Sequence, residues 1–391
     1  MNYWPTKKLG EICEKIKAGG TPSRKISKYW GGEIPFVKIE DLTSVELYLE
    51  NTQEKITQEG LENSNAWILP PNSVLFSIYA SIGEVAINKI PVATNQAILG
   101  LIPKSEIVDP KFLAYSLKKF GKYLISYNIQ STQKNLTLEI VKNFEIPLPP
   151  LAIQQKIVKI LNTIQEIIDI QEKIIKKTKE LKKSMMAELF KYGAPSFRKG
   201  RKLKKTEIGE IPQNWEVVRL GEVAKIKTGK SNVEDAADEG KYLFFDRSGE
   251  VKKSNKYLFD KEAVIVPGEG KEFLPKYYCG KFDLHQRAYA IFDFSKQLNG
   301  NYLFYTIHYF NKILCKLAVG TTVKSLRLPM FQNFLIPLPS LPEQEEIAKI
   351  LQIIDQKIEI EKKKKELYEE LFKTMLHKIM SQEIDINLLD Y

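Results

Sequence analysis

The residues that could perform metal or acid–base chemistry are few and lie far apart in this sequence. A structural zinc site is typically built from closely spaced pairs such as Cys-x₂₋₄-Cys and His-x₃₋₅-His, and the sequence contains neither. An odd number of unpatterned cysteines is typical of a reducing compartment. The sequence therefore predicts no metal site and no disulfide framework. The residues concerned are Cys13, Cys279, Cys315, His285, His308 and His377.

One segment has a superficial likeness to a phosphate-binding loop. It reads Pro267-Gly268-Glu269-Gly270-Lys271-Glu272, which lacks the first glycine of that loop. It also has glutamate where serine or threonine would hold magnesium. The acidic pair Glu40-Asp41 is interpreted as a loop feature. We therefore predict no catalytic residue in this chain. A nuclease or methyltransferase with an unrecognised site remains as an alternative.

The sequence is internally duplicated. Residues 132–138 align with residues 322–328, and residues 143–149 align with residues 333–339, at one constant offset of 190 residues (Thr322 minus Thr132). Half of the positions are identical from Gln130/Gly320 to Leu161/Leu351, without a gap. Such a repeat determines the architecture, so we expect two copies of one unit.

Each copy begins with a globular part. Short β-rich apolar runs at 34–39, 73–79, 84–87 and 97–102 are separated by turn signals, and a helix is expected from Pro110 to Phe120 after Asp109. Trp4 and Leu9 align with Trp215 and Leu220 at a larger offset than the later segments do. The first copy therefore carries additional residues in its front half. The predicted fold class is α+β, with two mixed α/β domains.

Each globular part is followed by a long helix. No proline or glycine occurs between Leu151 and Tyr192, and apolar residues recur there at steps of three, four and seven. The same pattern recurs from Pro342 to Ser381. We expect the two helices to bury their apolar stripes against each other as an antiparallel coiled coil with pseudo-two-fold symmetry. Two helices that splay toward separate partners are the alternative. The predicted interface residues are Ile157, Ile160, Leu161, Ile164, Ile168, Leu181, Met185, Ile347, Ile350, Leu351, Ile354, Ile358, Leu371 and Met375.

These patterns divide the chain into six segments. The first domain spans 1–150 and its helix spans 151–192. A basic linker, interpreted mainly as solvated, spans 193–207. The remaining segments are a second domain at 208–340, a second helix at 341–381 and a tail at 382–391.

The charge balance favours a polyanionic partner. Lys and Arg total 59 against 48 acidic residues, giving a net charge of +11. Nucleic acid is the commonest polyanion that such a surface binds. No apolar run approaches the ~20 residues that would span a bilayer. We expect a cytoplasmic protein without a membrane partner. A coiled-coil scaffold with no nucleic-acid role remains as an alternative.

Several motifs together resemble the specificity subunit of type I restriction–modification systems. The carrying segments are Lys17–Ser23, Tyr29–Phe36, Thr94–Ile98, Ile146–Ile157, Ile208–Trp215, Asp283–Arg287 and Ile336–Gln344. The resemblance implies two target-recognition domains, each reading one half of a split, asymmetric double-stranded DNA site. It also implies docking of two methyltransferase subunits and, through them, motor-nuclease subunits. S-adenosylmethionine, ATP and magnesium would be bound by those partners, and this chain would bind no cofactor.

The candidate DNA-binding residues are polar or basic side chains in loops. Such residues grip phosphates or read base edges. Gln96 and Gln286 are equivalent in the repeat, and either a base contact or a structural hydrogen bond is open for each. The first-domain candidates are Thr21, Ser23, Arg24, Lys25, Tyr79, Ser81, Gln96, Ser131, Thr132, Gln133 and Lys134. The second-domain candidates are Lys230, Ser231, Asp246, Arg247, Ser248, Glu269, Lys271, Gln286, Arg287, Thr321, Thr322 and Lys324.

Overall fold

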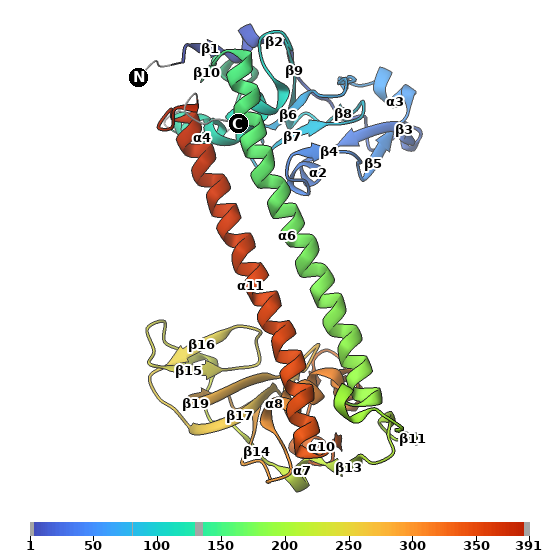
Figure 1. Ribbon diagram of the computed structural model, residues 1–391. Helices are drawn as coiled ribbons and strands as arrows, with labels where there is room; N and C mark the ends of the chain where they lie inside the picture. Colours follow the sequence, from blue (N-terminus) through green and yellow to red (C-terminus); the bar gives the residue numbers. More distant parts are fainter. Residues whose placement is uncertain (1–3, 80, 130–135, 387–391) are drawn as a thin grey trace. The chain divides into compact units, whose positions relative to one another are not determined.

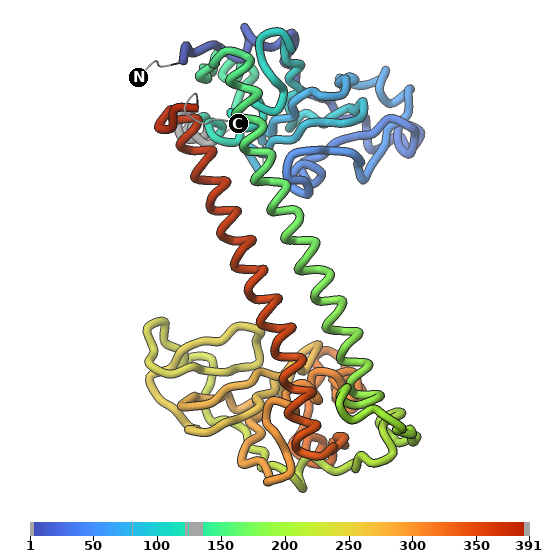
Figure 2. The backbone as a smooth tube through the Cα atoms, viewed as in Figure 1, coloured from blue at the N-terminus to red at the C-terminus, as the bar shows by residue number. Residues whose placement is uncertain are grey.

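The chain forms two compact units in a computed structural model. The structure describes residues 4–79, 81–129 and 136–386, without side chains at 122, 123 and 125–129. The first unit comprises residues 1–171 and 364–391, and the second comprises residues 172–363. Two long helices, α6 (Leu151–Tyr192) and α11 (Leu341–Met380), each contribute one half to each unit (Figure 1). Figure 2 shows the backbone of α6 as one continuous helix.

The first unit is built on a five-stranded sheet with the order β2-β9-β6-β7-β4. Its central strands consist almost entirely of buried residues, because helices cover one face and a second sheet lies beside it. That second sheet has the order β5-β3-β8. The strands are β2 (Cys13–Ala18), β3 (Trp30–Val37), β4 (Tyr48–Leu49), β5 (Glu54–Ile56), β6 (Val74–Ser77), β7 (Val85–Asn88), β8 (Ala93–Thr94) and β9 (Ile98–Pro103).

Short helices and a two-stranded ladder complete the first unit. Asp109 caps α4 through its Oδ1, which accepts hydrogen bonds from the backbone N–H groups of Lys111 (2.8 Å) and Phe112 (3.1 Å). The helix continues well past Phe120, where the sequence pattern predicted its end. The elements are β1 (Thr6–Lys8), α1 (Leu9–Ile12), η1 (Ser27–Tyr29), α2 (Ile39–Thr43), α3 (Gln58–Glu62), α4 (Pro110–Ile129), α5 (Leu138–Asn143) and β10 (Glu145–Pro147), which pairs with β1.

The second unit contains a six-stranded sheet with the order β14-β20-β17-β19-β15-β16. Its strands are β14 (Lys225–Thr228), β15 (Tyr242–Phe245), β16 (Val251–Ser254), β17 (Phe259–Pro267), β19 (Lys276–Leu284) and β20 (Ala288–Phe292). The other elements are η2 (Pro195–Phe197), β11 (Leu203–Thr206), β12 (Gly209–Pro212), β13 (Glu216–Arg219), α7 (Leu220–Val223), η3 (Val233–Asp235), β18 (Glu269–Gly270), α8 (Gly300–Tyr309), α9 (Asn311–Leu317), β21 (Lys324–Ser325), α10 (Leu328–Gln332) and β22 (Leu335–Leu338).

The two units share one strand topology. In each sheet three antiparallel pairings (β2-β9-β6-β7 and β14-β20-β17-β19) follow in the same order. A parallel pairing also recurs, since Phe36 pairs with Ala93 in the first unit and Phe244 pairs with Asp283 in the second. When the equivalent strands of the two units are aligned in this way, the additional residues of the first unit lie mainly at α2, β4 and α3. The predicted front-half difference is therefore divided among several loops of one common frame.

A buried glutamine fixes each long helix to its own globular part. The Nε2 of Gln154 donates to the carbonyls of Ile107 (3.0 Å) and Pro149 (2.8 Å), and its Oε1 accepts from the N–H of Asp109 (2.9 Å). In the second unit, Gln344 makes the same three bonds with the equivalent residues Gln297 (2.7 Å), Pro339 (2.8 Å) and Asn299 (2.9 Å). Asp109 and Asn299 cap α4 and α8, so one side chain ties two helices and the preceding strand together.

The helical stripe follows a seven-residue repeat in both helices. Leu161, Ile168 and Ile175 are buried at steps of seven, and their equivalents Leu351 and Ile358 are buried in α11. Each unit joins the first half of one helix to the second half of the other in a single apolar cluster, which gives the antiparallel direction. Most predicted interface residues lie in these clusters, namely Ile157, Ile160, Leu161, Ile164, Ile168, Met185, Ile347, Ile350, Leu351, Ile354 and Met375. Ile358 is also buried.

Two predicted interface residues lie outside the seam, which is the line of buried residues along which the two long helices pack. Leu181 and Leu371 occupy equivalent positions and are 51% and 42% exposed. The seam passes instead through Lys182, whose Nζ forms an ion pair with Asp355 at 2.6 Å. The prediction failed because Leu181 is the apolar residue seven positions after Ile174, whereas the inward-facing position seven residues after Ile175 is occupied by Lys182, which no apolar pattern would select.

The basic segment 193–207 is anchored to the second unit at Arg201, whereas Lys199, Lys202 and Lys205 are exposed, as expected for a solvated linker. Arg201 pairs with the fully buried carboxylate of Glu343 through both of its terminal nitrogens, with Nη2–Oε2 at 2.9 Å. The same carboxylate accepts from Trp215 Nε1 and from the N–H of Ala194, each at 3.1 Å. Gly193 has a φ of 83° at the end of α6, where a Cβ would meet Arg201 and Glu343. The segment is therefore anchored at a buried charge pair.

Candidate nucleic-acid interface

Four loops that carry most second-domain candidates converge in the second unit. They follow β14, β15 and β17 and precede β20. The Lys230 N–H donates to Leu284 O (3.1 Å), the His285 N–H to Phe245 O (2.9 Å), and the Gly268 N–H to Arg287 O (2.8 Å). Gly268 must be glycine, because a Cβ would lie 2.7 Å from the Arg287 carbonyl oxygen. Sequence positions that are 19 (268 to 287) to 54 (230 to 284) residues apart thus form one loop surface.

Two arginines share one carboxylate on this surface. Arg247 Nη1 lies 2.9 Å from Glu269 Oε2, and Arg287 Nη1 bonds the other oxygen, Oε1. The Glu269 side chain is only 13% exposed, whereas the two arginine side chains are 51% and 56% exposed. Burial raises the pKa of Glu269, but the hydrogen bonds from Arg287 and Arg247 outweigh it, so this pKa lies below its usual value. The carboxylate therefore stays ionised and holds both guanidinium groups.

A projecting loop flanks the arginine pair. β21 (Lys324–Ser325) pairs with β18 (Glu269–Gly270), and Gly320 has a φ of 120° that favours glycine. Thr321, Thr322 and Lys324 are exposed, and Lys271 is exposed on the neighbouring segment. The Nζ of Lys324 donates to Cys315 O at 3.1 Å. These four candidates therefore lie beside the arginines.

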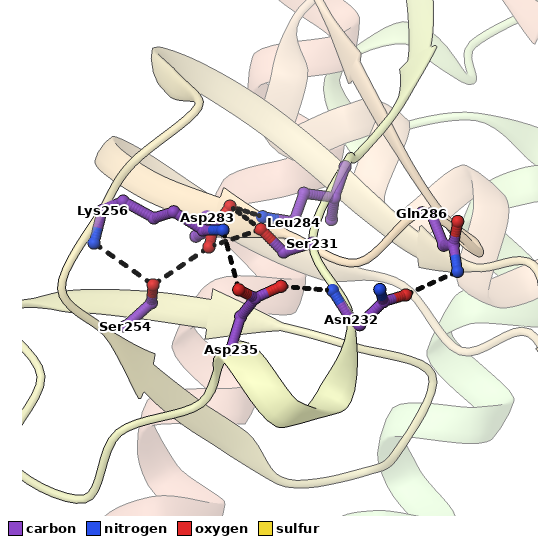
Figure 3. Close-up of polar contacts among 8 residues, drawn as sticks. All are labelled: Ser231, Asn232, Asp235, Ser254, Lys256, Asp283, Leu284 and Gln286. Carbon is purple, nitrogen blue, oxygen red and sulfur yellow. Dashed lines mark hydrogen bonds and ion pairs between the residues drawn. The ribbon is translucent and has the colours of Figure 1, made fainter.

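Two other candidates are buried and serve the structure, so the prediction that they contact DNA is wrong for this conformation. The Ser231 hydroxyl donates to Asp283 (2.8 Å to Oδ2), which also accepts from Ser254 Oγ at 3.0 Å (Figure 3). Asp246 pairs with Lys252 at 2.8 Å and accepts from the Ser248 N–H at 2.7 Å and from its hydroxyl. Both residues hold loop ends in place and expose almost no surface.

The turn at residues 285–287 is held by side-chain acceptors. His285 Nδ1 accepts from the Arg287 N–H at 3.0 Å, and burial lowers the pKa of this imidazole. Gln286 Nε2 donates to Asn232 Oδ1 at 2.6 Å (Figure 3). In the first unit the Thr21 hydroxyl bonds the equivalent Gln96. Both glutamines thus join the turn before β9 or β20 to the loop after β2 or β14, which favours a structural hydrogen bond.

The first unit also has a carboxylate that holds two basic side chains. Glu54 pairs with Arg24 Nη2 at 2.7 Å and with Lys38 Nζ at 2.9 Å. The Arg24 guanidinium stacks over Trp30 at 3.6 Å from the ring centroid, and Trp30 Nε1 donates to Ser23 O. Sequence reasoning found Arg24 and missed Lys38, Trp30 and Glu54, because only the β3–β5 register brings these residues together.

The remaining first-domain candidates occupy exposed loops or undescribed positions. Ser23, Lys25 and Ser81 are exposed, and Tyr79 is 36% exposed. Ser77, at the end of β6, bonds the carbonyl of Ser81 and so shapes this loop. Tyr79 lies 190 residues before Glu269, so both loops leave the same strand of the common frame. Ser131, Thr132, Gln133 and Lys134 lie outside the described residues.

The described residues contain no group of three or more His, Cys, Asp or Glu side chains that could hold a metal ion. Within the same residues no helix is long and apolar enough to span a bilayer. The exposed candidate side chains on the two loop surfaces carry guanidinium, ammonium, hydroxyl and amide groups. This chemistry suits recognition of an anionic polymer with hydrogen-bonding edges.

Known proteins share this duplicated arrangement. The model of the type I restriction modification DNA specificity domain matches residues 1–180 and 212–370. The MjaVIII specificity subunit of a type I restriction enzyme from Methanocaldococcus jannaschii is 29% identical over 99% of this chain and 94% of its own length. The EcoDI specificity subunit from Escherichia coli is 30% identical over 44% of this chain and 38% of its own.

Solved structures give the same fold. The S subunit of a type I restriction–modification system from M. genitalium has a TM-score of 0.58 and 16% identity, covering 96% of both chains. A chain from a structure of type I restriction–modification complex assembly and conformational transition has a TM-score of 0.63 and 20% identity, covering 97% of this chain and 98% of that one. The fold and loop surfaces thus define a duplicated recognition protein. The chain belongs to the type I restriction modification DNA specificity domain family.

Proposed function

We propose that this chain is the non-catalytic specificity subunit of a type I restriction–modification complex and reads a split, asymmetric DNA site. The observation that carries the proposal is one strand frame used twice with different loops. Arg24, Trp30 and Glu54 surround the loop surface of the first domain, whereas Arg247, Glu269 and Arg287 form that of the second. Different side chains on equivalent frames suit two different half-sites.

The partners are proposed from the outer faces of the long helices. In the first unit Ile170 and Leu371 are 52% and 42% exposed, and in the second unit their equivalents Ile360 and Leu181 are 50% and 51% exposed. Exposed apolar residues repeated at equivalent positions mark an interaction surface. We propose that a methyltransferase subunit docks at each copy, and that motor-nuclease subunits join through them. S-adenosylmethionine, ATP and magnesium would be bound by those partners.

Methylation mapping tests the reading function. The full chain is purified with the methyltransferase subunit of its host and incubated with S-adenosylmethionine and a mixed-sequence DNA library. We expect methylated adenines within one split motif, and no modification by either component alone. Modification or cleavage by this chain without a partner would instead support a self-sufficient enzyme. Failure to retain DNA in a salt-dependent manner would support a scaffold without a nucleic-acid role.

A matched pair of variants tests the docking surface. Ile170→Glu with Ile360→Glu places a charge at the exposed apolar position in both units and should abolish co-purification of the methyltransferase subunit. Lys183→Glu with Lys373→Glu changes two exposed equivalent positions on another face of the helices and should leave co-purification intact. Equal behaviour of the two double variants would exclude these positions from the docking surface.

A further inference from the structure

The paired arginines of the second domain are built more rigidly than phosphate contact requires. A side chain that only neutralises a phosphate can be mobile, since the attraction is non-directional. Base discrimination needs a donor fork held in a fixed orientation. Arg247 and Arg287 are each bound through one terminal nitrogen to Glu269, while about half of each side chain is exposed. Each guanidinium is therefore anchored on one side and open on the other.

The backbone around Glu269 is fixed as firmly as its side chain. Glu269 pairs with Ser325 in the β18–β21 ladder, and the Leu326 N–H donates to Gly268 O at 2.8 Å. Arg287 lies in the turn held by His285, and Arg247 follows β15, whose last residue accepts from the His285 N–H. Three separate loops thus position one carboxylate and two guanidinium groups on a common frame.

The net charge of this cluster also favours the edge of a DNA base as its ligand. Two guanidinium groups against one carboxylate leave one net positive charge on this cluster. Lys271 and Lys324 are exposed beside it and supply further positive charge for the phosphates. Outward-facing guanidinium N–H groups donate in pairs and accept nothing, and among the four bases guanine presents two acceptors, O6 and N7, side by side in the major groove.

We infer that Arg247 and Arg287 read guanine in the half-site of the second domain, with Glu269 as the positioning residue. This inference rests on the proposed function, because it presupposes that the domain faces a DNA half-site. It adds the base identity and the residues responsible. The first domain has tyrosine and alanine, Tyr79 and Ala97, at the positions equivalent to Glu269 and Arg287, so guanine reading by this device is confined to one half of the site.

The experiment uses the full chain in complex with its methyltransferase subunit, after the wild-type motif has been mapped. Binding is measured for DNA duplexes in which each base pair of both half-sites is replaced in turn. Arg287→Ala and Arg247→Ala should each lower affinity for the cognate duplex roughly five- to a hundredfold. Each should also remove the preference for guanine at one position of the second half-site and leave the first half-site unchanged. Arg219→Ala, at an exposed arginine on β13, serves as the control.

Glu269→Gln separates the role of Glu269 in positioning the two arginines from its effect on the local charge. Removal of one negative charge should strengthen binding to non-cognate DNA, because the local positive charge rises. The loss of the shared carboxylate should nevertheless weaken discrimination at the guanine positions. Conversely, a uniform loss of affinity across all sequences in the arginine variants, with a salt slope lower by about one, would reassign them as phosphate contacts.

Two outcomes bear on different claims. If the wild-type complex shows no split motif, the proposed function fails. If it shows a split motif whose second half contains no guanine, or if Arg247→Ala and Arg287→Ala leave the motif unchanged, the proposed function stands and the guanine assignment fails.

Discussion

The two domains share one arrangement of strands. At equivalent positions in it each domain has an ion pair, but the acidic and basic residues are exchanged between the two strands. In the first domain Lys38, after β3, pairs with Glu54 on β5 at 2.9 Å. In the second domain Asp246, after β15, pairs with Lys252 on β16 at 2.8 Å. Register places Glu54 opposite Phe36 and Lys252 opposite Phe244, so the positions are equivalent. Both domains place a charge pair there, but the frame does not fix which strand carries which sign.

A second comparison concerns the positions that did not diverge. Gln154 and Gln344 make the same three hydrogen bonds, and Asn95 and His285 do the same work in their turns. Asn95 Oδ1 accepts from the Ala97 N–H at 3.1 Å, as His285 Nδ1 accepts from the Arg287 N–H at 3.0 Å. These two pairs of positions, Gln154/Gln344 and Asn95/His285, are therefore equivalent in function. Four predictions test how far this equivalence extends.

The largest loss of stability is expected at Glu343, a buried position at which the two units differ. Glu343 is buried with Arg201 and Trp215, whereas its equivalent in the first unit is Ile153. Glu343→Gln leaves the guanidinium without its counter-charge and should destabilise the second unit by about 3–5 kcal/mol. Hydrogen–deuterium exchange should locate the loss in residues 172–363 and spare the first unit. Glu345→Gln, at a neighbouring exposed position, is the control and should change little.

The next largest loss of stability should be the same in both units. Gln154→Ala and Gln344→Ala each remove three hydrogen bonds and leave buried carbonyl and N–H groups unsatisfied, at a cost of about 3 kcal/mol. Denaturant unfolding of the two variants should give similar losses, each confined to its own unit by exchange measurements. A loss of stability in one unit only would show that Gln154 and Gln344 do not have equivalent roles. Gln155→Ala, next to Gln154 and exposed, provides the control.

Reversal of the ion pair sharpens the comparison further. Asp246→Lys places two cations together and should destabilise the second unit by about 2 kcal/mol, because the Asp246 side chain is only 2% exposed. Adding Lys252→Glu recreates the first-domain polarity and should recover part of this loss. Recovery is partial, since Asp246 also accepts from Ser248. No recovery in a double-mutant cycle would show that the two positions are not interchangeable.

The smallest effect should appear in the pH dependence. Burial lowers the pKa of His285, so below the ordinary value of about 6.5 the unfolded chain takes up a proton before the folded one does. Stability of the second unit should therefore fall as the pH decreases below about 6.5. His285→Asn keeps the acceptor, as Asn95 does, and should flatten this part of the curve. The slope that remains should come partly from His308, whose pKa burial also lowers. Thermal unfolding between pH 5 and 7.5 measures the difference, and an unchanged slope would contradict the assignment to His285.

The sequence by itself determined the duplication, the fold class and the two long helices. Leu151–Tyr192 was predicted with the observed bounds, because a helix free of proline and glycine is a local property and its apolar steps report its own period. Gly193 marked the end for the same local reason. The equivalence of the copies was also visible, since one constant offset relates them from Thr132 onward.

Only the tertiary structure decided which side chains meet. Arg247, Glu269 and Arg287 lie on three loops, and no spacing relates them. Leu181 and Leu371 were assigned to the seam because neighbouring apolar residues fit the same step, and packing placed both outside it. Ser231 and Asp246 were assigned to the surface, although the buried Asp283 binds Ser231 and the half-buried Lys252 pairs with Asp246, which is itself buried. Helical period is encoded along the chain, whereas a charge or hydroxyl finds its partner through strand register and loop closure, which only the folded chain defines.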